Sequence, residues 1–407
     1  MGAWFFLEGV GTSFLPKKEV PNVPLEAGMR IVGVSWQGYG LPFRTPYVTS
    51  EGRATLKYGL LIFLRNNEGL VGVGEASPVG PGSAAQVQQA ASMLDELSPQ
   101  IVYGQVGRYM LSPPDETLPN LMALGLLPAL AFGLETARLD LLGVSQGKSV
   151  AEMLGGAPRR LNVNAIIASD SPAQAAAEAA QAVALGFTSL KLKVGRGIEQ
   201  DVALAAAVRE AVGPGVKLRI DANQGWSVPQ AIEAINRLAR FGLEYVEQPV
   251  AAGDLAGMAE VRRSVSVNIA ADEALRSAQD VGRILEAEAA DIFILKAARL
   301  GGLRESLNAA EAAAKSGKAV VVTSSLESGV GLAASAHLAS ALASHPFAHG
   351  LGTGLLYAED LLEKPLLPER GALLTPQGPG LGVSVDDRQL RRYAIGVTGS
   401  MGVPLGA

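Results

Sequence analysis

Five residues with reactive side chains follow one another at a nearly constant interval in the second half of the chain. They are Lys193, Asp221, Glu247, Asp272 and Lys296, and each ends a short, mostly apolar run that is typical of a strand. The intervals are 28, 26, 25 and 24 residues. One strand, one helix and two short loops of a (β/α)8 barrel take about that length, and such barrels carry their active sites at the carboxyl ends of the strands. We therefore expect the five side chains to converge on one mouth.

The three acids of this set suit a hard divalent cation. Asp221, Glu247 and Asp272 end consecutive predicted strands, and Mg²⁺ prefers oxygen ligands while leaving positions for water and substrate. A lone acid at a strand end more often caps the next helix or forms a salt bridge, but three acids in register favour a metal site. Asn223 and Glu273 adjoin two predicted ligands. We expect them to orient the ligands and a lysine from behind, with Glu273 as an alternative ligand.

The lysines suit proton abstraction. Lys191 and Lys193 point to the same side of their strand because side chains alternate. A nearby cation lowers the pKa of a lysine and makes it a usable base, although a structural ion pair is the alternative for any one barrel lysine. Three predicted strands lie between those of Lys193 and Lys296, so the two lysines could address opposite faces of one substrate. Loss of a proton alpha to a carboxylate gives an enediolate, which requires positive charge at its oxygens, and a divalent metal supplies it.

The composition excludes several classes of protein. The 407 residues carry a net charge of −5 and scattered basic residues, which argues against nucleic-acid binding. There are no cysteines and only three histidines, which excludes thiolate sites and histidine-rich metal sites. The apolar stretch 121–134 is too short to span a membrane. We expect a cytoplasmic protein without a membrane partner. The sequence is compatible with a homo-oligomer but does not specify one.

The first part of the chain predicts a small α+β domain. Residues 1–28 are expected to be a peripheral extension, since they lack the basic start of a signal peptide. A domain is then expected over 29–155. Its predicted strands and helices are strands 29–37, 57–65 and 71–78 and helices 83–98 and 117–143.

The pattern changes near Leu161 to alternating strands and helices. Seven strand–helix units and a short final strand are predicted over 156–370. The strands are mostly apolar on both faces, as a parallel sheet covered by helices requires. Ser227 is the predicted N-cap of one of the helices. Residues 371–407 are expected to pack back on the first domain.

A glycine-rich stretch follows the seventh predicted strand. Residues 324–335 match a dinucleotide-binding pattern weakly, because the acidic partner for the ribose is missing. The start of the following helix, with Ser324, Ser325 and Leu326, is instead predicted to bind a remote carboxylate of the substrate.

Two further segments are predicted to contact the substrate. Gly352, Thr353 and Gly354 are expected to bring the backbone close to the ligand, although a plain tight turn explains them equally well. Arg44 lies in a loop, residues 42–46, that is expected to close over the site.

The combined motifs resemble those of the enolase superfamily, in its muconate-lactonizing-enzyme subgroup. The matching positions are Lys191-x-Lys193, Asp221-x-Asn223, Glu247-Gln-Pro, Asp272-Glu273, and Lys296 followed by Gly301-Gly302. This resemblance implies an α/β fold: a modified (β/α)7β TIM-type barrel with an N-terminal α+β capping domain. It also implies one Mg²⁺, with Mn²⁺ as an alternative ion, a catalytic base at Lys193 and a tuning role for Lys191.

Within the superfamily, residues 321–331 (VVTSSLESGVG) and 349–361 (HGLGTGLLYAEDL) resemble the o-succinylbenzoate synthase family. That resemblance implies a lyase of menaquinone or phylloquinone biosynthesis that dehydrates a small carboxylate, 2-succinyl-6-hydroxy-2,4-cyclohexadiene-1-carboxylate. N-succinylamino-acid racemases share much of the pattern and stay open, as does an enzyme with both activities. Dipeptide epimerases are disfavoured because Gly352-Thr353-Gly354 replaces their Asp-x-Asp. An inactive binding barrel is disfavoured because all five reactive positions keep competent side chains.

Overall fold

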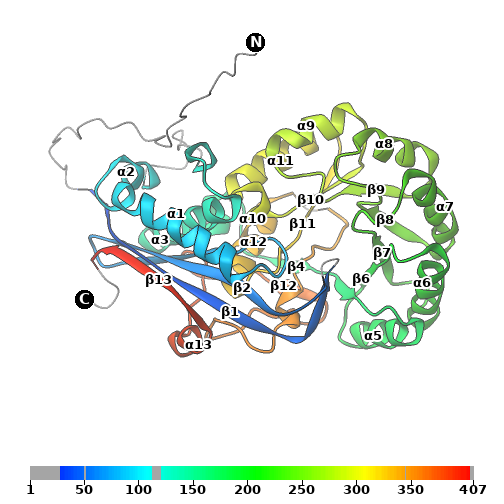
Figure 1. The fold of residues 1–407 in the computed structure, drawn as a ribbon, viewed down its shortest axis with the longest axis horizontal. Helices are drawn as coiled ribbons and strands as arrows, with labels where there is room; N and C mark the ends of the chain where they lie inside the picture. Colours follow the sequence, from blue (N-terminus) through cyan, green and yellow to red (C-terminus); the bar gives the residue numbers. More distant parts are fainter. Residues whose placement is uncertain (1–27, 50–51, 112–120, 344, 404–407) are drawn as a thin grey trace, which may run out of the picture.

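A four-stranded antiparallel sheet and a seven-stranded parallel sheet organise the chain (Figure 1). The computed structural model describes residues 28–49, 52–111, 121–343 and 345–403. The predicted peripheral extension therefore lies almost entirely outside the described residues. None of the helices in the described part is long and apolar enough to cross a membrane.

The antiparallel sheet forms the capping domain. Three helices pack with one of its faces around a shared apolar core. The last strand of the chain lies beside the first, with Thr398 opposite Gln37, so the C-terminal segment packs back on this domain. In spatial order the strands are β13 (Ala394–Gly402), β1 (Ile31–Thr49), β2 (Gly52–Asn66) and β3 (Val71–Ala76), and the helices are α1 (Ala84–Val102), α2 (Gln105–Met110) and α3 (Pro128–Gln146).

Two capping-domain predictions need correction. Strands β1 and β2 are much longer than expected and form one extended hairpin. The single helix predicted over 117–143 is wrong at its start: residues 121–124 form the short helix η1 (Leu121–Leu124), and α3 begins at Pro128. Leu127 is extended, because a residue before proline avoids the helical region. Residues 112–120 lie outside the described residues.

The parallel sheet curls into the barrel and is closed by a very short last strand. His349 bridges Val163 and Gly350 bridges Thr323, both in parallel. The predicted (β/α)7β barrel with its capping domain is thus confirmed, although the expected strand over 162–167 is split in two. The strands of the parallel sheet are β5 (Ala165–Ile167), β6 (Ser189–Lys193), β7 (Lys217–Asp221), β8 (Leu243–Glu247), β9 (Asn268–Ala271), β10 (Ile292–Leu295) and β11 (Ala319–Val322). A separate antiparallel pair is formed by β4 (Arg160–Asn162) and β12 (Ala372–Leu374).

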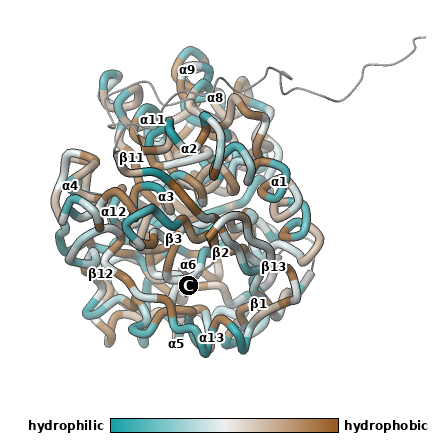
Figure 2. Tube along the Cα trace, turned by 90° about the vertical axis from the view of Figure 1, so that its left-hand side faces the viewer, coloured by the Kyte–Doolittle hydropathy of each residue, from teal (hydrophilic) through white to brown (hydrophobic). Residues whose placement is uncertain are grey.

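Helices cover the outside of the barrel. Ser227 caps α7 in a capping box with Gln230, which confirms the predicted start. Hydrophobic and hydrophilic residues alternate along outer helices such as α9, whose Val281 and Ile284 are buried (Figure 2). The helices are α4 (Val150–Met153), α5 (Pro172–Ala184), α6 (Ile198–Val212), α7 (Val228–Leu238), η2 (Ala239–Phe241), α8 (Leu255–Ser264), α9 (Ala278–Glu286), α10 (Ala297–Leu300), α11 (Leu303–Lys315), α12 (Gly329–Ala341), η3 (Thr353–Leu356) and α13 (Asp387–Arg392).

The side chains inside the barrel lie in layers, and the reactive polar residues form the layer nearest the mouth. Lys193 pairs in register with Asp221, and Lys191 with Arg219 one layer below. Beneath the polar layer lies a small apolar cluster made of Tyr245, Ala270, Ile292, Ile294 and Val321. The fully buried Arg219 pairs with Glu244 Oε2 at 2.6 Å and donates to Tyr245 Oη at 2.9 Å and to the Ala348 carbonyl at 2.8 Å, so it fills the lower interior without an unpaired charge.

Candidate active site

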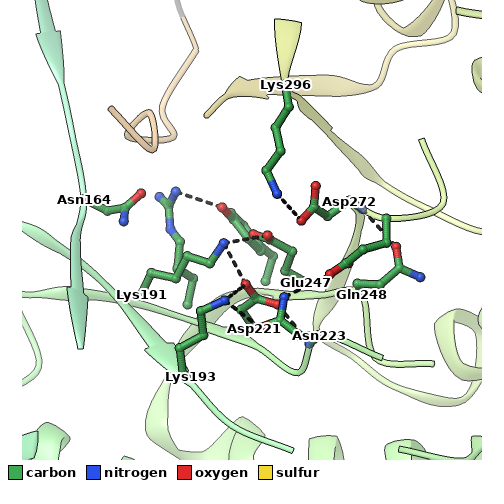
Figure 3. Close-up of polar contacts among 12 residues, drawn as sticks. Asn164, Lys191, Lys193, Asp221, Asn223, Glu247, Gln248, Asp272 and Lys296 are labelled. Atoms are coloured by element: carbon green, nitrogen blue, oxygen red, sulfur yellow. Dashed lines mark hydrogen bonds and ion pairs between the residues drawn. The ribbon is translucent and has the colours of Figure 1, made fainter. Parts of the chain in front are cut away.

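The ends of β6, β7 and β8 bring two lysines and two acids into direct contact (Figure 3). Lys191 Nζ lies 2.9 Å from Asp221 Oδ2 and 2.5 Å from Glu247 Oε1, so it bridges the two carboxylates. Lys193 Nζ lies 2.8 Å from the same Asp221 oxygen. Both acids are buried, whereas Lys193 keeps 24% of its side chain exposed and can reach a ligand.

Asp272 continues the row and is held by two cations of its own. Lys296 Nζ lies 2.5 Å from Oδ2, and Arg299 Nη1 lies 2.8 Å from Oδ1. Arg299 also donates to the Asp272 carbonyl at 2.7 Å. The Gln248 side chain fixes the backbone from below by accepting from the N–H groups of Asp272 and Ala274, each at 3.0 Å. Lys296 therefore stands at the end of the row opposite Lys193.

Asn223 and Glu273 form a supporting chain behind the row. Lys193 Nζ donates to Asn223 Oδ1 at 2.5 Å, and Asn223 Nδ2 donates to Glu273 Oε1 at 3.0 Å. Glu273 thus orients the lysine only through Asn223, rather than by direct contact.

Comparison with known proteins assigns this architecture to a family. Residues 31–155 match the family model described as the N-terminal domain of mandelate racemase and muconate lactonizing enzyme. Residues 174–389 match the model described as enolase C-terminal domain-like. The chain belongs to the enolase superfamily. It lies in the muconate-lactonizing-enzyme subgroup, as the motifs predicted.

Several enzymes of this superfamily are similar to the chain along most of its length. The o-succinylbenzoate synthase of Thermobifida fusca is 44% identical over 250 residues, which cover 60% of this chain and 75% of that protein. The hydrophobic dipeptide epimerase of Enterococcus faecalis is 32% identical and covers 88% of this chain and 100% of its own. The structure of N-succinyl Arg/Lys racemase from Bacillus cereus aligns with a TM-score of 0.83 at 25% identity, covering 91% of this chain and 100% of that one. The chain is therefore an enolase superfamily enzyme, and the family alone does not select one reaction.

The two lysines at the ends of the row differ in acidity. Burial lowers the pKa of Lys296, and the neighbouring Arg299 guanidinium lowers it further. Burial would also lower the pKa of Lys193, but the Asp221 carboxylate outweighs burial and raises it. A neighbouring cation lowers the pKa of both lysines, as expected: Arg299 acts on Lys296 and Lys191 acts on Lys193. At Lys193 the nearby Asp221 carboxylate makes the net shift of the pKa upward.

The acids of this enolase superfamily site differ as well. Burial alone would raise the pKa of Asp221, but Lys191 and Lys193 hold it well below its usual range. Burial and the Asp221 charge raise the pKa of Glu247 to about 7. Of the three carboxylates, Glu247 therefore has the least positive charge nearby to compensate its own.

The donor set fits a divalent cation. Asp221, Glu247 and Asp272 offer oxygen ligands only, and the buried Glu247 Oε2 has no hydrogen-bond partner among the described residues. In that part of the chain no three His, Cys, Asp or Glu side chains are already closed around one point. Lys191 bridges the Asp221 and Glu247 carboxylates, and Lys296 pairs with Asp272, so each of the three acids has an ammonium group beside it.

The structure corrects the prediction for the start of α12. Its N–H groups do not face a ligand, because acids of the protein already occupy them. Glu75, from strand β3 of the capping domain, accepts from Ser328 N and Gly331 N, each at 2.9 Å. Asp360 accepts from Gly329 N at 2.9 Å. The anion expected at this helix terminus is thus internal to the protein.

The loop before α12 is also turned inward. Ser324 Oγ and Ser325 N both donate to Glu327 Oε2, at 2.5 and 2.7 Å, and the Leu326 carbonyl accepts from Tyr357 Oη. These groups of Ser324 and Leu326 thus already have partners within the protein, and contacts of the two residues with the substrate stay predictions. Ser325 Oγ is buried without a hydrogen-bond partner in the described part, so its contact with the substrate stays a prediction.

The remaining predicted substrate contacts are spread over two segments. Gly352 is the N-cap of η3, and Thr353 is buried with its hydroxyl unpaired among the described residues. Arg44 is exposed on the β1–β2 hairpin. Contacts of Gly352, Thr353, Gly354 and Arg44 with a substrate stay predictions.

Sequence reasoning missed three groups that shape the site. Arg299 follows Lys296 by one helical turn, and this spacing was an available signal for a second cation on the same face. Gln248 directly follows Glu247, but its inward orientation depends on a backbone φ of 38° that the sequence does not announce. The third, Glu75, lies 253 positions before its partner Ser328, so no local pattern could have found it.

Proposed function

We propose that this enzyme is an o-succinylbenzoate synthase, a Mg²⁺-dependent lyase that dehydrates 2-succinyl-6-hydroxy-2,4-cyclohexadiene-1-carboxylate. The observation that carries the proposal is the arrangement of Lys193 and Lys296 at opposite ends of one row of carboxylates. The similarity to the Thermobifida fusca synthase supports this choice of reaction. The sequence Gly352-Thr353-Gly354, which lacks an Asp-x-Asp, speaks against a dipeptide epimerase.

Asp221, Glu247 and Asp272 would hold the Mg²⁺. When bound, the ion would neutralise these acids and stabilise negative charge that develops on the substrate carboxylate. Mn²⁺ suits the same oxygen ligands. The protein's own lysines carry out the proton transfers and supply the remaining positive charge.

Lys193 acts as the base in the proposed reaction. Lys193 first loses a proton to solvent and with it the ion pair with Asp221. As the neutral amine it then takes the proton alpha to the ring carboxylate, so that an enediolate forms. Lys191, one layer below, keeps its charge through Asp221 and Glu247, both of which raise its pKa against the opposing effect of burial. Its positive charge beside Lys193 favours the neutral form of the base.

Lys296 remains an ammonium on the other face and stabilises the enediolate by its charge. Lys193 then returns its proton to the adjacent hydroxyl, the C–O bond breaks, and water leaves. The ring becomes aromatic, which makes the second step favourable. One acid–base residue therefore suffices for the whole dehydration.

A racemase of N-succinylamino acids is the second candidate. It needs both lysines to exchange protons, and one observation favours it: burial and Arg299 lower the pKa of Lys296, which helps that lysine lose its proton. The similarity to the Bacillus cereus racemase structure supports the same alternative. An enzyme with both activities is compatible with one site.

The test is a pair of assays on one preparation. Loss of the diene absorbance of the cyclohexadiene substrate is followed with Mg²⁺ and with EDTA, and racemisation of N-succinyl amino acids is followed by polarimetry. Metal-dependent dehydration supports the synthase. Robust racemisation without dehydration would replace the synthase by the racemase. Genes for menaquinone synthesis beside this one would support the first outcome.

A further inference from the structure

Helix α3 of the capping domain carries a carboxylate that reaches a helix of the barrel. Glu135 Oε2 accepts from Leu303 N at 2.5 Å, and Glu135 Oε1 accepts from Arg304 N at 3.2 Å. These are the first two residues of α11. The N-cap of α11 is Gly302, which has no side chain to satisfy the free N–H groups. A residue of the other domain therefore supplies the cap, and its negative charge suits the positive end of the helix.

The capped segment begins at Lys296. Lys296 is the N-cap of the short helix α10, and the N–H groups of Gly301 and Gly302 both donate to the Ala297 carbonyl at 3.1 Å. Residues 296–302 therefore form one continuous tight turn. Its start is tied to Asp272 through Lys296 and Arg299, and its end is tied to Glu135.

The backbone at the end of this turn, at Gly301 and Gly302, is tightly constrained. Gly302 has a φ of 154° and Gly301 a φ of 91°, conformations that residues with a side chain rarely adopt. A Cβ atom on Gly302 would overlap with Glu135 Oε2. The carboxylate thus packs directly on the backbone that it holds, so movement of Glu135 would be transmitted to the turn.

We propose that Glu135 is a positioning residue that holds the Lys296–Gly302 turn from the capping domain and so sets the place of the Lys296 ammonium beside the substrate. The effect on turnover rests on the proposed function, because that function gives Lys296 its role. The effect of Glu135 on the position of the Lys296–Gly302 turn is independent of the proposed function.

Asp140, on the same helix, provides a matched control. Its buried carboxylate also accepts two backbone N–H groups from outside α3, Val73 N at 2.8 Å and Leu381 N at 2.6 Å. Neither partner lies in the turn that bears Lys296. Asp140→Asn therefore removes a similar link from the same helix without touching the proposed connection.

The first experiment needs no substrate. Lysine methylation is followed by mass spectrometry in wild type, Glu135→Gln and Asp140→Asn, with Lys193 as internal reference, and amide exchange is followed over residues 297–304. Glu135→Gln is expected to label Lys296 about fivefold faster relative to Lys193 and to expose these amides, while Asp140→Asn leaves both readouts unchanged. Equal labelling of Lys296 in all three proteins would overturn the proposal. Gly302→Ala disturbs the same contact from the other side and replaces Glu135→Gln if that variant does not fold.

The second experiment measures steady-state dehydration. Lys296 opposes charge that develops in the transition state, so Glu135→Gln is expected to lower kcat about tenfold and to change KM less than about twofold. Asp140→Asn is expected to lower the Tm but keep kcat. A parallel loss of kcat in both variants would mean that Glu135 is merely structural. If the wild type does not dehydrate the substrate, the proposed function fails, and the labelling experiment still decides the role of Glu135.

Discussion

Lys193 and Lys296 terminate a single row of buried carboxylates from opposite ends, with Lys193 Nζ 2.8 Å from Asp221 Oδ2 and Lys296 Nζ 2.5 Å from Asp272 Oδ2. Glu247 lies between them and is bridged to Asp221 by Lys191. A substrate carboxylate held over this row would have one ammonium on each side.

Replacing Lys193 and replacing Lys296 should lower the rate of dehydration by different factors. Lys193→Ala is expected to lower dehydration by about 10³-fold or more, because the base itself is lost. Lys296→Ala is expected to lower it by about 10²-fold, because only a stabilising charge is lost. Both rates are measured as kcat/KM with the cyclohexadiene substrate. Equal losses in the two variants would argue that both lysines transfer protons, as in a racemase.

Metal binding should stabilise the folded enzyme. A ligand present at 100 times its Kd contributes about 2.7 kcal/mol to the free energy of unfolding, so Mg²⁺ is expected to raise the Tm above its value in EDTA. Glu247→Gln should abolish this difference because it removes a predicted ligand. Glu199→Gln is the control, since Glu199 is an exposed acid paired with Arg237. A Mg²⁺ effect that survives in Glu247→Gln would count against the predicted ligands.

The Glu75 link between the domains should matter for stability. Its carboxylate accepts from Tyr39 Oη, Ser328 N, Ser328 Oγ and Gly331 N. Glu75→Gln turns an amide N–H₂ group toward some of these donors, so we expect a loss of about 1–3 kcal/mol in the free energy of unfolding. Ser83→Ala removes the half-buried side-chain cap of α1 and is expected to cost about 0.5–1 kcal/mol. Urea unfolding measures both, and a smaller loss for Glu75→Gln than for Ser83→Ala would refute the prediction.

Stability should fall in mild acid because of a buried histidine. Burial, with His345, Arg159 and Arg219 nearby, lowers the pKa of His349 to about 3. Because the folded pKa lies below the unfolded value of about 6.5, this contribution to stability is complete above pH 6.5 and is lost as the pH falls toward 3. Over the two pH units below 6.5 the loss is about 2.7 kcal/mol.

His349→Asn tests this directly. His349 Nδ1 accepts from Val322 N at 3.2 Å, and an asparagine oxygen can accept in its place without titrating. The variant is expected to show a flatter dependence of the free energy of unfolding on pH between 6.5 and 4.5. An unchanged slope would assign the acid sensitivity to other groups.

The sequence was sufficient for the barrel and for the five residues of the row, since Lys193, Asp221 and Glu247 end strands whose apolar runs recur at the length of one βα unit. It was insufficient where partners are far apart. The start of α12 looked like an anion site because its N–H groups are free in the local pattern. Glu75, which fills that site, comes from another sheet. Glu135 and Leu303 are likewise 168 positions apart.

In the proposed enzyme, Asp221, Glu247 and Asp272 share one divalent ion between two ammonium groups. Anomalous diffraction from a crystal soaked with Mn²⁺ tests it most directly. We expect one strong peak within bonding distance of all three carboxylates, with Lys193 and Lys296 on opposite sides of it. A peak elsewhere, or both lysines on the same side of the ion, would contradict it.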